Sequence, residues 1–184
     1  MAPAPLSPID RAYDRYQILT RLLDLARQRA LGDPTHERNV GVGLTTRGQT
    51  REDAVRNIED AFEDLGGLVN HVAILDMAGV FESHFRARLD TAIGEARKVV
   101  RERFRSSVPL HAHRESLIHD ADDFQGLADI GRLIGHRVSA EVQDNWEMIR
   151  KNRNSFAHGT DIRRPPTITS ERTKDTLKEI IEAL

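Results

Sequence analysis

The stretch LVNHVAILDMAGVFESHFRARL, residues 68–89, is the most apolar part of the chain and decides the fold. In its first half, apolar side chains lie most of the way round a helix, and others follow at helical spacing toward Phe104. A helix that is apolar on nearly every side is usually buried among other helices. The stretch therefore predicts the central helix of a bundle over about residues 68–104. Gly66 and Gly67 directly precede it, and this pair predicts a bend or break.

Helix start signals flank this stretch on both sides. Ser7 stands where an N-cap is needed, directly before Pro8, and Thr50 forms a capping-box-like pair with Asp53. Toward the C-terminal end, apolar spacing predicts helices over about 124–134 and 139–157 and a last helix capped by Thr169 or Ser170. The first helix carries apolar residues at helical spacing: Ala12, Tyr16, Leu19, Leu23, Ala26 and Ala30. No strand-like alternation is present, so we expect an all-α protein.

The length of 184 residues predicts one domain, a single bundle of five or six helices over residues 1–184. The prediction of a helical bundle is best supported for residues 50–184. Residues 33–49 are rich in Gly and Thr without a period, which predicts a long loop that wraps a partner subunit, lies over a groove or is simply mobile. No uninterrupted apolar run reaches the length of a membrane span, and Met1–Pro8 lacks the features of a signal peptide. We therefore expect a cytoplasmic protein that has no membrane partner.

The segment RKNRNSFAHG, residues 150–159, holds the candidate chemistry. Its helix has an apolar stripe of Val142, Trp146 and Ile149, and Arg153 continues that stripe before Phe156. A cation on a core-facing stripe is costly unless it is paired, so Arg153 should have a specific partner or role. The segment also contains His158, and Gly159 is a typical residue at the end of a helix.

Arg153 and His158 together suit cleavage of RNA without a metal ion. An imidazole can take a proton from a ribose 2′-hydroxyl or give one to the leaving oxygen, and a guanidinium can stabilise the extra negative charge on phosphorus. Arg114 and His119 have the same spacing, but they lack the following Asn, the long preceding helix and the Gly. The net charge of −2 gives no overall attraction to nucleic acid, so an RNA site must be a local basic patch.

An Arg-Asn-x-x-x-His motif followed by Gly, late in an all-helical chain and before one last short helix, resembles the HEPN superfamily. Many members of that superfamily are metal-independent endoribonucleases of toxin–antitoxin, antiphage-defence or RNA-processing systems. The resemblance implies that Arg153, Asn154 and His158 form the active site, that no cofactor is needed and that RNA is the substrate. It also implies an antitoxin or defence-system protein as a partner, and an acidic partner for Arg153, for which Glu82 is the candidate.

Basic residues gather around the motif and are the candidates for RNA binding: Arg150, Lys151, Arg163 and Arg164. The resemblance further implies a homodimer whose two Arg153/His158 pairs line one groove, with a two-fold axis near Gly159. Trp146, Phe156 and part of the 68–89 helix are the apolar candidates for that interface.

Two other functions stay open. A catalytically silent helical module that binds a nucleotide or a protein would need the same fold. A metallohydrolase would use the metal-ligand-rich run between Ser106 and Gly135, because imidazole and carboxylate groups suit Zn²⁺ and Mn²⁺. That run contains His111, His113, His119, Asp120, Asp122 and Asp123. Weak apolar periodicity around it favours a polar loop, and no metal is assigned to the site.

Overall fold

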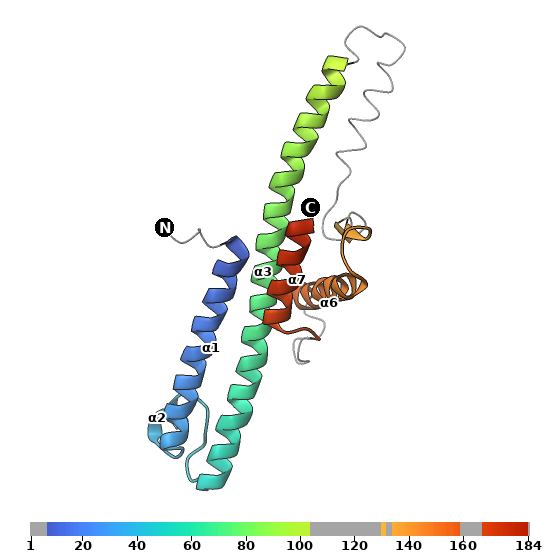
Figure 1. The fold of residues 1–184 in the computed structure, drawn as a ribbon. Helices are drawn as coiled ribbons and strands as arrows, with labels where there is room; N and C mark the ends of the chain where they lie inside the picture. Colours follow the sequence, from blue (N-terminus) through green and yellow to red (C-terminus); the bar gives the residue numbers. More distant parts are fainter. Residues whose placement is uncertain (1–6, 104–129, 132–133, 159–166, 184) are drawn as a thin grey trace, which may run out of the picture.

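A computed structural model describes residues 7–103, 130–131, 134–158 and 167–183 of the chain, and its elements there are all helices (Figure 1). They are α1 (Pro8–Gly32), α2 (Glu37–Gly41), α3 (Arg51–Arg103), α6 (Ala140–Ala157) and α7 (Ser170–Ala183). The expectation of an all-α protein with a long central helix is confirmed for these residues. Ser7, Thr50 and Ser139 each accept a hydrogen bond from a backbone N–H three residues later, which satisfies the first turn of α1, α3 and α6.

Helix α3 is continuous over 53 residues, so the predicted break at Gly66 and Gly67 is wrong. A glycine inside a helix costs about 1 kcal/mol relative to alanine, and packing on both sides offsets that cost. Phe62 and Ala73 are buried on either side of the pair, and the Leu23 side chain of α1 lies 4.0 Å from where a Cβ on Gly66 would be. Burial of the turns on either side of the glycines therefore keeps the helix continuous through them.

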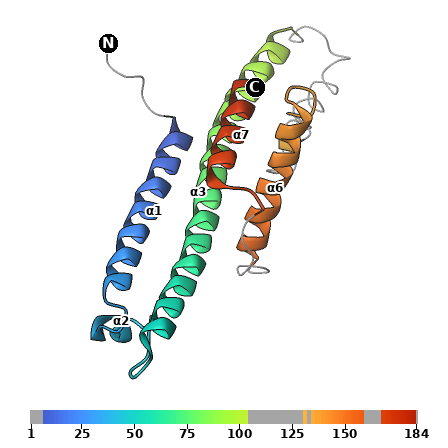
Figure 2. The same ribbon diagram turned by 60° about the horizontal axis from the view of Figure 1, so that its bottom comes forward.

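Helix α1 runs antiparallel along the first part of α3, as Figures 1 and 2 show. Ion pairs from Arg15 to Asp76 and from Arg27 to Glu59 show the register of the two helices. A small apolar cluster lies between their ends at the connection: Ala30, Ile58 and Phe62, with Leu23, Leu31 and Leu44 against it. Leu19 and Ala26, which were expected on the buried face of α1, are exposed. The buried face of α1 instead starts at Ile9 and Ala12, and it does not include Leu19 or Ala26.

The 33–49 connection is not a structureless loop, because α2 lies within it. His36 caps this helix with its Nδ1. The buried Asn39 donates from its amide nitrogen to the carbonyl oxygens of Ala30, Asp33 and Pro34. These bonds fasten the connection to the end of α1. The glycines at 43 and 48 both have a φ of 79°, which only glycine adopts readily.

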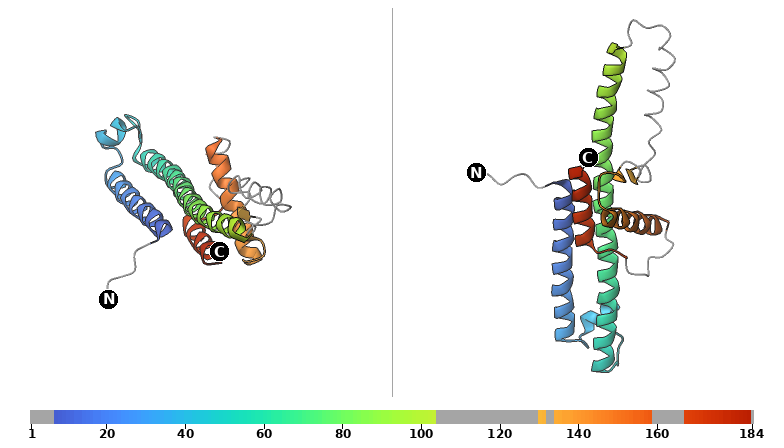
Figure 3. Two further views of the ribbon diagram at one scale, coloured as in Figure 1. Left: turned by 90° about the horizontal axis from the view of Figure 1, so that it is seen from above. Right: turned by 45° about the vertical axis from the view of Figure 1, so that its right-hand side comes forward.

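The main core lies higher along α3, where α6 and α7 pack against it (Figure 3). The rings of Phe81 and Trp146 meet there with centroids 5.4 Å apart. The cluster draws on every major helix: Ile9, Ala12, Ala73, Ile74, Met77, Ala78, Phe81, Phe85, Ile130, Ile134, Val142, Trp146, Ile149, Ile168, Leu177 and Ile180. Because Trp146 is fully buried here, the expectation that it lies at a subunit interface is wrong.

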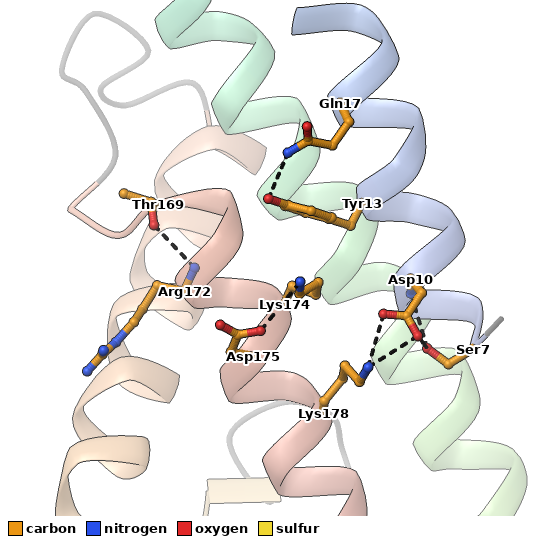
Figure 4. A network of polar contacts seen from close by, with 9 residues as sticks. All are labelled: Ser7, Asp10, Tyr13, Gln17, Thr169, Arg172, Lys174, Asp175 and Lys178. Atoms are coloured by element: carbon orange, nitrogen blue, oxygen red, sulfur yellow. Dashed lines mark hydrogen bonds and ion pairs between the residues drawn. The ribbon is translucent and has the colours of Figure 1, made fainter.

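Polar contacts join α7 to α1 at the top of the hairpin (Figure 4). Lys178 Nζ lies 3.1 Å from Asp10 Oδ1, and Lys174 Nζ sits 4.4 Å from the centroid of the Tyr13 ring. The Ser7 hydroxyl donates to the Asp10 carboxylate and, together with Lys178, holds the pKa of Asp10 below its ordinary value. Thr169 caps α7 by accepting from the Arg172 N–H, which selects it over Ser170 as the N-cap.

Helix α3 also meets the length and hydropathy expected of a membrane span, over an 18-residue window with a mean hydropathy of 1.2. A third of that window is buried inside the protein. The core helix of a bundle passes the same test, so this one helix is weak evidence for a membrane.

Candidate functional site at the end of helix α6

Helix α6 carries the candidate motif and is anchored by its apolar stripe. Val142, Trp146 and Ile149 are buried, as their spacing predicted. Arg153 comes one turn after Ile149 on the same side, and its side chain is 40% exposed. The guanidinium therefore lies at the edge of the core, where α6 emerges from its contact with α3.

The partner of Arg153 is Glu82 of α3. The Arg153 Nη2 atom lies 3.6 Å from Glu82 Oε2, and the Glu82 side chain is only 18% exposed. Arg153 Nη1 also donates to the Asn154 side-chain oxygen at 3.2 Å. The structure thus brings together three of the residues singled out from the sequence, although two of them lie about seventy positions from the third. The cost of placing a cation on the core-facing side is offset by this ion pair.

His158 is the C-cap of α6, and its side chain is exposed. Its backbone N–H donates to the Asn154 carbonyl oxygen at 3.0 Å. The imidazole has no hydrogen-bond or ion-pair partner among the described residues. Asn154 is the connecting residue, because its side chain binds Arg153 while its carbonyl holds the end of the helix at His158. Gly159 lies outside the described residues.

Arg86 is a site residue that the sequence analysis missed. Its Nη2 donates to Glu82 Oε1 at 2.9 Å, so the Glu82 carboxylate binds one guanidinium with each oxygen. The Arg86 side chain is 57% exposed. Two cations around one carboxylate leave a local charge of +1, which makes this point attractive to a phosphate. A Glu and an Arg four residues apart on a helix was the signal that could have found it.

The predicted RNA-binding residues differ in their surroundings. Glu147 accepts three hydrogen bonds from Arg150, at 2.8 Å, 3.2 Å and 3.3 Å, and raises the pKa of the Arg150 guanidinium. Most of the charge of Arg150 is therefore balanced within α6. Lys151 is exposed. Arg163 and Arg164 lie outside the described residues.

Two contacts hold the last turn of α6 in place. The Phe156 ring packs on His71 of α3, with ring centroids 5.8 Å apart, and His71 is buried. Asn152 donates to the Met148 carbonyl oxygen and to the Thr167 hydroxyl, which ties α6 to the segment before α7. His71 thus has an aromatic partner that its sequence position did not reveal. These contacts restrict the motion of the backbone that carries Arg153 and His158.

Within the described ranges, no three His, Cys, Asp or Glu side chains gather closely enough to hold a metal ion. The run from His111 to Asp123 lies outside these ranges. Comparisons with protein families, with curated proteins and with solved structures found no match to this chain.

Proposed function

We propose that this protein is a metal-independent endoribonuclease whose site is built from Arg153, Asn154 and His158. The observation that carries the proposal is the ion pair of Arg153 with the mostly buried Glu82 in the last turns of the helix that ends at the exposed His158. Glu82 fixes the guanidinium at the rim of the core, and Asn154 links it to the turn that carries His158. Phosphodiester transfer requires a fixed cation and a proton carrier, and the end of α6 carries a residue of each kind.

The reaction that fits these groups is attack by the ribose 2′-oxygen on the adjacent phosphorus. A proton leaves the 2′-hydroxyl and another reaches the departing 5′-oxygen, with His158 as the acid or base for one of the two transfers. Arg153 stabilises the negative charge on the pentacoordinate phosphorus. The products carry a 2′,3′-cyclic phosphate and a 5′-hydroxyl, and no oxidant or metal takes part. The RNA, its cytoplasmic setting and a role in toxin, antiphage or RNA-processing systems all belong to this proposal.

The central test uses paired variants on short RNA in the presence of EDTA. We expect His158→Ala and Arg153→Ala each to lower cleavage about a hundredfold to ten-thousandfold. His136→Ala and Arg101→Ala are matched controls, because both side chains are exposed and lie outside the motif. Unchanged cleavage by His158→Ala would end the assignment.

A second experiment tests the chemistry itself. Replacing the ribose at the scissile position with 2′-deoxyribose should block cutting there, since the attacking oxygen is then absent. Cleavage at that position, or a requirement for added metal, would count against the mechanism and in favour of the metallohydrolase.

The silent binding module is the second candidate, and one observation favours it. Arg153 is already satisfied by Glu82 and Asn154, so the ion pair can serve packing alone. In that case purified protein would bind RNA or a nucleotide without cutting it, and Arg153→Ala would lower stability rather than a reaction rate.

A homodimer belongs to the proposed function, because a second copy would double the local positive charge on a chain of net charge −2. Mixing Arg153→Ala subunits with His158→Ala subunits tests whether two chains share one site. Recovered activity in the mixture means that each site draws on both subunits. No recovery means that each chain carries a whole site.

A further inference from the structure

The lower part of the α1–α3 hairpin has an exposed apolar surface, which we call the hairpin face. It is formed by Leu19 and Leu22 of α1 and by Leu65, Leu68 and Val72 of α3, with Ile18 and Leu25 along its outer edge. Each of these seven side chains is 40–61% exposed. Exposed leucines scattered singly are ordinary, but a contiguous patch on the order of several hundred Å² marks an interaction site.

The Arg15–Asp76 ion pair shows that the two rows of this face lie on the same side of the hairpin. It bridges α1 and α3 at 2.6 Å. Leu19 and Leu22 follow Arg15 at the next helical turns, and Val72 and Leu68 precede Asp76 at the corresponding turns of the antiparallel helix. The rows therefore run side by side below the bridge. The Arg27–Glu59 pair lies along the other side, where α7 also joins the hairpin higher up.

No third helix of the described residues covers this region. Figure 1 and the right-hand view of Figure 3 show α6 and α7 beside the middle of α3, while below them α1 and α3 stand as a pair. A pair of helices in water needs a further layer to bury its second apolar side. The sequence of this face supplies the pattern for one, since Leu65, Leu68, Val72 and Leu75 recur at spacings of three and four.

We propose that the hairpin face binds the hairpin face of a second copy of this chain, so that two α1–α3 pairs form a four-helix bundle. The spacing of three and four residues on α3 is that of helices which interdigitate with other helices. A two-fold axis parallel to the hairpin would place α1 of one copy on α3 of the other, antiparallel. A stable interface needs about 800 Å² per partner, so the polar border of the face must be buried together with its seven apolar side chains.

Charge at the borders of the face favours this pairing. Arg29 lies one turn after Leu25 on α1, and Asp64 lies one turn before Leu68 on α3. Both are exposed, and neither has an ion-pair partner among the described residues. Placing α1 against the α3 of a second copy brings the basic border of one to the acidic border of the other. Pairing α1 with α1 would bring like charges together, which opposes association.

The hairpin face is a different surface from the motif at the end of α6, so this inference does not rest on the proposed function and its test needs no RNA. A dimer formed through the motif would survive Leu22→Asp and Leu68→Asp, whereas a dimer formed through the hairpin face would not. The molar mass of the purified full chain is measured by light scattering at micromolar concentration, with helix content followed by circular dichroism. We expect a dimer. Leu22→Asp and Leu68→Asp should each weaken dimerisation at least about a hundredfold, because a carboxylate would be buried in an apolar interface, and leave a folded monomer. Val42→Asp is the matched control, since Val42 is 68% exposed on the connection and outside the face.

A monomeric wild type at micromolar concentration, or a dimer that Leu22→Asp and Leu68→Asp leave intact, would overturn the proposal. The orientation is tested by charge reversal. Arg29→Glu and Asp64→Arg should each weaken the dimer, and combining the two changes should restore it. Failure of the combination to restore the dimer would overturn the placement of α1 on the α3 of the second copy.

Discussion

The two parts of helix α3 differ in what covers them. From Ala73 to Phe85 the helix is enclosed by α1, α6 and α7, and its apolar side chains lie in the main core. From Leu65 to Val72 it has α1 on one side and exposed leucine or valine side chains on the other. The composition of the two parts is similar, so the difference comes from their neighbours. One helix thus holds Glu82, the partner of Arg153, where it is covered, and the proposed hairpin-face interface where it is not.

The position of the candidate site follows from this difference. Glu82 can hold Arg153 at the rim because the surrounding core fixes both helices. In the uncovered part an ion pair of this kind would be fully solvated and worth little. A charged group such as the Arg153 guanidinium can therefore be held in a fixed position only at the enclosed end of the bundle.

The largest expected effect contrasts large side chains from the two parts. Phe81→Ala should destabilise the protein by about 3–5 kcal/mol, because Phe81 is fully buried against Trp146 and a cavity would remain. Leu68→Ala should change the stability of the monomer much less, by about 1 kcal/mol, since Leu68 is 40% exposed and no closed cavity would remain. Urea unfolding of both variants measures the contrast, with the monomer maintained by Leu22→Asp in each. Equal losses would mean that Leu68 is covered by another part of the same chain.

Local signals in the sequence were enough to locate most of the fold. The caps at Ser7 and Thr50 and the apolar stripe of α6 depend on residues within a few turns of one another, so local signals predicted them correctly. The ending of α6 at Ala157 follows from the same kind of signal. Such features are set before any tertiary contact is made.

Features that depend on distant contacts were not predictable in this way. The glycines at 66 and 67 predicted a break, whereas burial of Phe62 and Ala73 in the flanking turns keeps α3 continuous. Which leucines of α1 face outward depends on where α3 lies, so the spacing along α1 alone could not show that Leu19 is exposed. The pairing of Glu82 with Arg153 was expected only from a family resemblance, and the second cation at Glu82, Arg86, was not expected at all.

A smaller effect tests whether the two parts of α3 form one rigid rod. Replacing both Gly66 and Gly67 with Ala should raise stability by about 1–2 kcal/mol, because alanine favours a helix by about 1 kcal/mol per position. There is room for both methyl groups, since the nearest atom to a Cβ at Gly66 is 4.0 Å away and none lies within that distance at Gly67. Thermal and urea unfolding measure the gain. A loss of stability in the double variant would show that the helix bends at this point. The two parts of α3 would then not form one rigid rod.

The smallest effect is a pH dependence confined to the covered part. Asp10 has a folded-state pKa below its ordinary value, chiefly because the Ser7 hydroxyl donates to it, with Lys178 beside it. A depressed pKa means that the contribution to stability is present above the unfolded-state value of about 3.9 and is lost as pH falls through the folded value. Asp10→Asn should therefore lower stability by about 0.5–1 kcal/mol at pH 7, as expected for a carboxylate in the first turn of a helix, and by nothing measurable near pH 2. Amide hydrogen exchange at pH 7 should be faster in the variant than in the wild type at the α1–α7 contact. From Leu65 to Val72 the exchange rates should be unchanged. A difference between wild type and variant that persists at low pH would mean that Asp10 acts through packing rather than through its charge.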